Sequence, residues 1–152
     1  MRKKKDIKVL LVDDEIAFVN TLAQRLRLRK LLVDTVYDGE QALSYIKEIE
    51  PDVIVLDLKM PGLHGIEVLR EIKKIKREIQ VIILTGHGTD KDEEEARKLG
   101  GFDYLQKPAD IDLLVRKIKE AFSEKIERAM TAATFAQAGV FDEAKKIIEK
   151  KE

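Results

Sequence analysis

Five short runs rich in β-branched and other apolar residues recur along the chain at roughly even spacing, with helix-length segments between them. The runs are IKVLLV (7–12), LLVDTV (31–36), DVIVLD (52–57), VIILT (81–85) and FDYLQ (102–106). The first, third and fourth runs are continuously apolar, which is typical of strands that are covered on both faces. The pattern therefore predicts a parallel sheet buried between helices.

The segments between the runs have the apolar period of amphipathic helices. Phe18, Leu22 and Leu26 recur at helical spacing after the first run, and a similar stripe occupies residues 42–49 after the second. Right-handed crossovers between parallel strands then place helices on both faces of the sheet. We expect an α/β fold with a doubly wound, five-stranded parallel sheet, flavodoxin-like, in the order 2-1-3-4-5.

The C-terminal part of the chain predicts one unusually long helix. After Pro108, Asp110 or Asp112 can cap a helix whose apolar period continues to Ala133, further than a helix that only covers the sheet requires. Gly139 is expected to end this helix, and a second short amphipathic helix is expected at about 141–150. We therefore divide the chain into a globular domain, 1–122, and a helical C-terminal extension, 123–152.

Composition narrows the classes of function. Lys plus Arg equals Asp plus Glu at 29 each, so no net charge attracts nucleic acid or an anionic membrane. The chain has no Cys, which excludes disulfides, thiolate zinc sites and cysteine nucleophiles. The first residues, MRKKKD, do not have the apolar stretch expected of a signal peptide, and no apolar run approaches the roughly 20 residues of a membrane span. We expect a soluble, cytoplasmic protein that binds neither DNA nor membranes directly.

Polar side chains stand where the predicted strands end. Asp13 and Asp14 end the first run, Asp57 the third and Thr85 the fourth, and Lys107 follows the fifth. The carboxyl ends of strands 1 and 3 flank the point where the connections reverse direction, so these groups should converge. Three close carboxylates share a proton or bind a cation, and Mg²⁺ prefers such oxygen ligands. Lys107 would neutralise a phosphoryl group or keep Asp57 ionised.

Four motifs at these strand ends carry a family resemblance. LLVDDE, LDLKMPGLHG, LTGHGT and YLQKP, in this order and with these separations, resemble the receiver domain of bacterial two-component response regulators over about residues 6–122. The resemblance implies that Asp57 is the phosphoacceptor. It also implies that Asp13 and Asp14 hold Mg²⁺ together with Asp57 and the backbone carbonyl of Lys59.

The resemblance assigns roles to the neighbouring residues as well. Thr85 and Lys107 would contact the phosphoryl group, and Tyr104 matches the aromatic residue that switches position on phosphorylation. Lys59 and His87 occupy positions that resemble sites for tuning the phosphoryl lifetime. The Lys107–Pro108 bond would be cis, as is typical of such domains.

The function that follows is phosphorelay signal transduction by a stand-alone receiver domain (1–122). A sensor histidine kinase or phosphotransfer protein would donate the phosphoryl group in a Mg²⁺-dependent reaction. About thirty residues remain after the receiver, too few for an effector domain, so output to an unknown downstream protein would pass through protein contact. The chain would not be an enzyme beyond catalysing its own phosphorylation and slow dephosphorylation.

Three other functions are alternatives for a chain with this pattern. A flavodoxin-type binder needs an anion-receiving loop after strand 1, where this chain has Asp13, Asp14 and Glu15. A haloacid-dehalogenase-like phosphatase needs a D-x-D pattern there, which LVDDEI lacks. A scaffold or dimerisation module that is never phosphorylated is the remaining alternative, and the intact Asp57 and Lys107 argue against it.

The extension predicts an intermolecular surface. Ile126, Ala129, Met130, Ala133 and Ala136 form one apolar stripe. The short helix at 141–150 could fold back on this stripe as a hairpin, or the stripe could pair with its copy in a homodimer through the C-terminal helices. The segment FAQAGVFDEAKK resembles a tetratricopeptide hairpin. We favour a hairpin that also supplies a surface for a second copy or a target.

Overall fold

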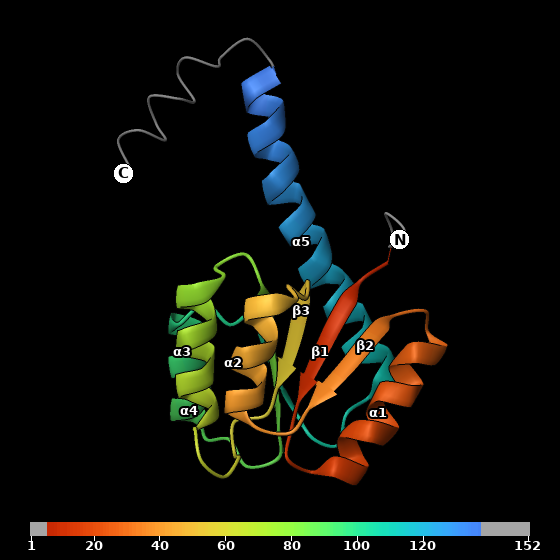
Figure 1. Ribbon diagram of the computed structural model, residues 1–152, viewed down its shortest axis with the longest axis vertical. Coiled ribbons are helices and arrows are strands. Elements are labelled where there is room, and N and C mark those ends of the chain that lie inside the picture. Colours follow the sequence, from red (N-terminus) through yellow and green to blue (C-terminus); the bar gives the residue numbers. More distant parts are fainter. Residues whose placement is uncertain (1–5, 138–152) are drawn as a thin grey trace.

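The computed structural model of the chain describes the backbone of residues 6–137 and the side chains of residues 6–131, in one five-stranded sheet flanked by helices (Figure 1). The strands are β1 (Lys8–Val12), β2 (Leu32–Val36), β3 (Val53–Leu56), β4 (Gln80–Thr85) and β5 (Asp103–Gln106). The helices are α1 (Ile16–Leu28), α2 (Gly39–Glu48), α3 (Gly65–Ile75), α4 (Asp90–Lys98) and α5 (Ile111–Gln137).

All strand pairs are parallel and the sheet order is β2-β1-β3-β4-β5, which confirms the predicted doubly wound fold. Val12 is in register with Val36 on one side and Leu56 on the other, so the carboxyl ends of these strands are level. The ladder continues one residue further, since the amide of Asp57 donates to the Val12 carbonyl at 3.0 Å. This register places the residues after β1 and β3 side by side.

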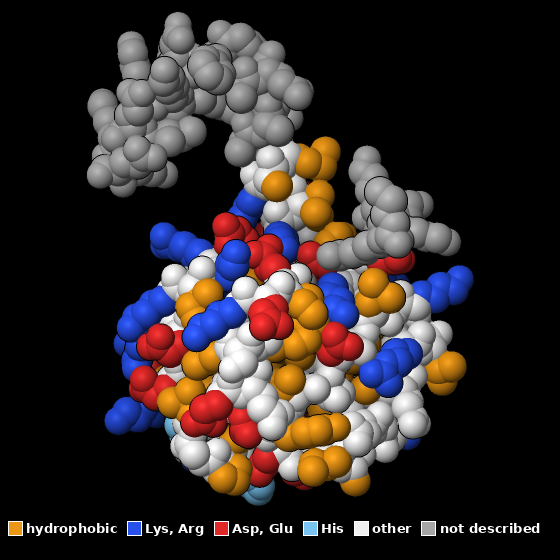
Figure 2. All heavy atoms as spheres, viewed as in Figure 1, with side chains coloured by type: hydrophobic (Ala, Val, Ile, Leu, Met, Phe, Trp, Pro, Cys, Tyr) orange, Lys and Arg blue, Asp and Glu red, His pale blue; other side chains and the backbone are white. Residues whose placement is uncertain are grey.

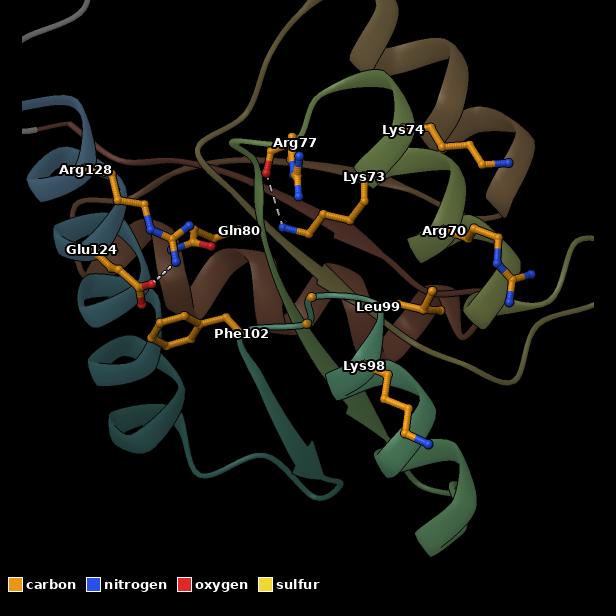
Figure 3. Close-up of a pocket in the computed structure, with 12 residues that line it drawn as sticks. Arg70, Lys73, Lys74, Arg77, Gln80, Lys98, Leu99, Phe102, Glu124 and Arg128 are labelled. Carbon is orange, nitrogen blue, oxygen red and sulfur yellow. Dashed lines mark hydrogen bonds and ion pairs between the residues drawn. The ribbon is translucent and has the colours of Figure 1, made fainter. Parts of the chain in front are cut away.

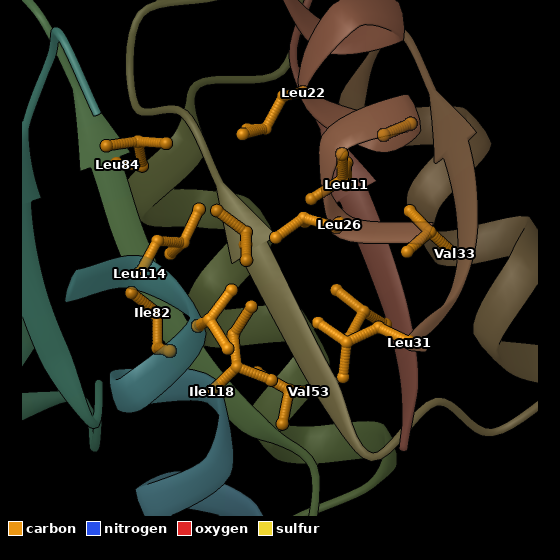
Figure 4. Packing of buried hydrophobic residues seen from close by; sticks show 14 of the residues in the cluster. Leu11, Leu22, Leu26, Leu31, Val33, Val53, Ile82, Leu84, Leu114 and Ile118 are labelled. Atoms are coloured by element: carbon orange, nitrogen blue, oxygen red, sulfur yellow. The ribbon is translucent and has the colours of Figure 1, made fainter. Parts of the chain in front are cut away.

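Each face of the sheet has its own apolar core because alternate residues of a strand point to opposite faces. Leu11 and Ile82 pack with α1 and α5 on one face, as Figure 4 shows, where Leu114 of α5 joins them. Leu10 and Ile83 belong to the opposite cluster, which α2, α3 and α4 cover. Burial on both faces explains why β3 and the central residues of β1 and β4 are continuously apolar.

Side chains cap the starts of four helices, α2 to α5, among which α5 and α4 show how the caps form. Asp110 caps α5, because its Oδ1 accepts from the amides of Asp112 at 3.0 Å and Leu113 at 3.3 Å. The sequence had left Asp110 and Asp112 as alternatives. Thr89 and Asp92 form a reciprocal capping box at the start of α4. That cap follows a T-x-x-D pattern, a local signal in the sequence that was not among the predicted helix starts.

Helix α5 extends well beyond the sheet, as predicted (Figure 1). It runs unbroken through the boundary expected between residues 122 and 123, and Lys125 forms an ion pair with Asp52 at 3.1 Å. Further along, Ile126 and Met130 are 38% and 62% exposed. Within residues 6–137, no helix combines the length and apolarity needed to cross a membrane. The helix end at Gly139 and the helix at 141–150 lie outside the described residues.

Candidate functional site

An acidic cluster stands at the carboxyl ends of β1 and β3, toward which the strand arrows point in Figure 1. Asp13, Asp14 and Asp57 each bring one carboxylate oxygen within 4.8 Å of the others. Asp13 and Asp57 are buried and Asp14 is half-buried. Hard divalent cations such as Mg²⁺ prefer oxygen donors and accept one or two carboxylates plus water. The cluster therefore fits the magnesium ion that the sequence predicted.

Burial makes negative charge costly in this cluster. Desolvation raises the pKa of the Asp13 carboxyl above its ordinary value, and the neighbouring Asp57 charge adds to this rise. Hydrogen bonds from Lys107 and from the backbone amide of Glu15, the latter at 2.9 Å, act in the opposite direction. The balance leaves carboxylates whose charge is only partly compensated, so that a cation would stabilise the cluster.

Lys107 supplies the positive charge in the described structure. Its Nζ lies 2.7 Å from Oδ2 of Asp13, 2.7 Å from Oε1 of Glu15 and 3.6 Å from Oδ2 of Asp57. Burial alone would lower the pKa of Lys107, but the hydrogen bonds to Asp13 and Glu15 raise it above its ordinary value. The ammonium group thus stays charged and bridges the carboxylates.

Two contacts of Lys107 were not predicted from the sequence. Its bond to Glu15 lowers the pKa of that exposed carboxyl. Its Nζ also lies 4.4 Å from the centroid of the Phe18 ring, in a cation–π arrangement. The helical period had marked Phe18 as a packing residue only. Because Lys107 is about ninety positions away in the chain, no local pattern signals either contact.

Thr85 and Tyr104 lie next to each other beneath the loop that follows β4. Thr85 is buried, and its Oγ1 accepts from the amide of His87 at 3.5 Å. A Cβ built on Gly88 would lie 1.5 Å from the Tyr104 hydroxyl oxygen and 2.8 Å from Cγ2 of Thr85. The Tyr104 hydroxyl is buried and has no hydrogen-bond partner among the described residues. The Tyr104 hydroxyl therefore occupies the space against Gly88, beside the Thr85 methyl group.

Lys59 and His87 are exposed beside this cluster. The backbone amide of Lys59 donates to Oδ1 of Asp57 at 3.4 Å. The charge of His87 contributes to the lowered pKa of Glu15, so the two side chains are within electrostatic reach. The Lys107–Pro108 peptide bond is cis, as the resemblance implied. All the site residues expected from the sequence thus gather at one end of the sheet, while their individual roles remain predictions.

Comparisons with known proteins agree with this arrangement. The model of the response regulator receiver domain family matches residues 9–119. A response regulator receiver domain protein from Clostridium thermocellum is 37% identical, with a TM-score of 0.75, 78% of this chain and 96% of that chain covered. The receiver domain of the Francisella response regulator 1452 is 31% identical, with a TM-score of 0.72 and coverages of 78% and 98%.

A more distant structure shows the same fold. The CheY-like receiver domain protein from Methanospirillum hungatei JF-1 is 24% identical, with a TM-score of 0.78 over 80% of this chain and 98% of that one. The family match covers β1 through most of the part of α5 that packs on the sheet, and so includes the acidic cluster, Thr85 and Lys107. The chain therefore belongs to the response regulator receiver domain family, the receiver module of two-component signalling.

Proposed function

We propose that the protein accepts a phosphoryl group on Asp57 from the phosphohistidine of a sensor kinase or a phosphotransfer protein. One observation carries this proposal. The buried Asp57 carboxylate lies 3.6 Å from the Lys107 ammonium and within a 4.8 Å cluster with Asp13 and Asp14. A nucleophile, a fixed positive charge and a set of metal ligands are thus combined in one site, as phosphoryl transfer requires.

The transfer is an in-line displacement at phosphorus. As the bond from an Asp57 oxygen to phosphorus forms, the bond from phosphorus to the donor's imidazole nitrogen breaks, and the imidazole takes up a proton. Lys107 neutralises charge on the phosphoryl oxygens through this loose transition state. A bound Mg²⁺, held by Asp13, Asp14, Asp57 and the Lys59 carbonyl, would supply further charge neutralisation there.

The signal would pass from the phosphoryl group through Thr85 and Tyr104 to the surface. Phosphorylated Asp57 presents new acceptor oxygens, to one of which the Thr85 hydroxyl can donate. Because the Tyr104 hydroxyl and the Thr85 methyl group both lie against Gly88, movement of Thr85 would favour one position of the Tyr104 ring over another. Lys59 and His87 would tune the lifetime of the phosphoryl group. In this proposal the chain catalyses only its own phosphorylation and slow dephosphorylation, and acts in the cytoplasm through protein contacts rather than by binding DNA or membranes.

The part of α5 beyond the sheet would be the surface for a second copy or a downstream protein. Figure 2 shows hydrophobic side chains on this part of the helix, and Ile126 and Met130 are the exposed large ones described there. Deleting residues 129–152 keeps Lys125 and its ion pair with Asp52. We expect the shortened protein to be phosphorylated normally but to sediment as a smaller species. An unchanged oligomeric state would rule out self-association through this segment.

Phosphorylation itself is tested by incubating the full chain with Mg²⁺ and acetyl phosphate, followed by intact-mass spectrometry. The wild type should gain one phosphoryl group, and Asp57→Asn should gain none because an amide is a poor nucleophile. Asp112→Asn, which changes an exposed carboxylate on α5, is the matched control. Labelling of Asp57→Asn at the wild-type rate would disprove the assignment. Failure of the wild type to be labelled would favour the scaffold alternative.

A further inference from the structure

A basic groove lies at the end of the sheet opposite to Asp57. It has a volume of about 690 Å³ and is bounded by α3, α4, α5 and the starts of β4 and β5. Its cationic lining residues are Arg70, Lys73, Lys74, Arg77, Lys98 and Arg128. Among the described residues, Glu124 is the only acidic one in the lining. In Figure 2, Lys and Arg side chains gather on this side of the molecule, near the C-terminal end of α3.

Helix ends account for only part of this charge. Lys73 and Lys74 lie in the last turn of α3, and Lys98 lies in the last turn of α4, where cations stabilise the helix dipole. Arg77, however, belongs to the loop after α3, and Arg128 belongs to the body of α5. Three helices and a loop thus contribute cations to the lining, and in Figure 3 Lys73, Arg77 and Arg128 lie nearest one another.

Lys73 is held in place inside the groove. Its Nζ donates to the carbonyl oxygens of Ile79 at 2.8 Å and Arg77 at 3.4 Å, which leaves one of the three ammonium protons for a ligand. Its stem packs beside Gly100, where a Cβ would lie 3.4 Å from Cε of Lys73, an ordinary contact. Burial lowers the pKa of Lys73, and the charges of Arg128 and Arg77 lower it further. These cations therefore repel one another.

The positive charge is incompletely neutralised. Arg70, Lys74 and Lys98 have carboxylate partners on their own or a neighbouring helix, and Arg128 pairs with Glu124. Within the described part of the chain, no carboxylate forms an ion pair with Lys73 or Arg77. A ligand with at least two negative charges would therefore relieve the repulsion between them. The Phe102 ring and Leu99 add an apolar wall beside the cations.

We propose that the basic groove binds a ligand with two linked phosphates, either pyrophosphate itself or the diphosphate of a nucleotide. Guanidinium and ammonium groups are the usual partners of phosphate oxygens, and Arg77 and Lys73 would be the central contacts. In a nucleotide, the base would stack on the Phe102 ring. The site does not include Asp57 and does not depend on its phosphorylation.

The test is calorimetric titration of the full-length Asp57→Asn protein with pyrophosphate and with ADP, both without Mg²⁺, so that the acidic cluster cannot contribute. Arg77→Gln should weaken the binding of both ligands about tenfold, the value of one charge-assisted hydrogen bond. Glu124→Gln should strengthen the binding of both, because it releases Arg128. Lys91→Gln removes an exposed charge on α4 outside the groove and should change neither affinity.

The Phe102→Leu variant distinguishes the two possible ligands, pyrophosphate and a nucleotide diphosphate. Weaker ADP binding with unchanged pyrophosphate binding supports the groove as a nucleotide site. Unchanged binding of both supports it as a site for the phosphates alone. Absence of binding of either ligand at about 1 mM would overturn the proposal. Equal losses in Arg77→Gln and Lys91→Gln would also overturn it, because they would show attraction to surface charge in general.

Discussion

The Tyr104 hydroxyl lies so close beneath Gly88 that a Cβ on residue 88 would come within 1.5 Å of its oxygen. The inward position of the Tyr104 ring therefore requires glycine at residue 88. Since Thr85 contacts the same space, the loop after β4, the candidate switch aromatic and the candidate phosphoryl-binding hydroxyl are packed as one unit. A change in any one of them should affect the other two.

Gly88→Ala should force the Tyr104 ring out of its pocket without any phosphorylation. NMR of the Tyr104 ring protons, and of the amides of residues 86–106, would report the displacement. Gly86→Ala is the matched control in the same loop, because a Cβ there would lie 3.7 Å from its nearest neighbour, an ordinary contact. Ring shifts in Gly88→Ala no larger than those in Gly86→Ala would show that the ring has room elsewhere.

Tyr104→Phe should stabilise the protein by about 1 kcal/mol, because it removes a buried hydroxyl without a partner among the described residues. Tyr45→Phe should do the opposite. The Tyr45 hydroxyl donates to Oδ2 of Asp34 at 2.5 Å, so its loss should cost about 1 kcal/mol. Urea unfolding of the two variants beside the wild type measures both values. Equal changes in the free energy of unfolding for Tyr104→Phe and Tyr45→Phe would contradict the conclusion that the Tyr104 hydroxyl is unpaired.

The ionisation of Asp34 should make the stability lost in Tyr45→Phe depend on pH. The hydrogen bond from Tyr45, followed by that from Lys8, holds the pKa of the Asp34 carboxyl below its ordinary value of 3.8. A lowered pKa in the folded state adds stability above pH 3.8, and this stability is lost as the pH falls through the folded value. The loss caused by Tyr45→Phe should therefore be largest near neutral pH and shrink below pH 3.8. A constant loss from pH 7 to pH 3 would show that Asp34 is not coupled to Tyr45.

Glu15→Gln should increase the rate of phosphorylation by acetyl phosphate severalfold. In the described structure Glu15 holds Lys107 at 2.7 Å, while Asp57 is 3.6 Å from the same ammonium. Neutralising Glu15 would let Lys107 move toward Asp57 and would remove one negative charge from the approach of the phosphodonor. Glu48→Gln, at the exposed end of α2, is the control. A slower Glu15→Gln would mean that Glu15 positions Lys107 for the reaction instead of withdrawing it.

The fold could be predicted from local patterns because burial on both faces of the sheet imposes them directly. The apolar runs at β1, β3 and β4 and the helical period of the connections predicted a parallel, doubly wound sheet, and five strands with five helices suit the order 2-1-3-4-5. The candidate site was predictable for the same reason. In parallel strands the carboxyl ends meet at one edge, so Asp13, Asp57 and Thr85 had to converge once the strand order was known.

Tertiary structure alone decided which side chains touch across that edge and elsewhere. Glu15 and Lys107 meet although about ninety positions separate them, and Gly88 is packed on Tyr104 from a different element. The basic groove collects residues from three helices and a loop. Side-chain direction and loop conformation determine these contacts, and neither leaves a periodic signal in the sequence. Hydrophobic burial imposes periodic patterns on the sequence, so the fold and the residues at the strand ends could be predicted from it. The partners of the charged and aromatic side chains depend on the folded structure, so only that structure identifies them.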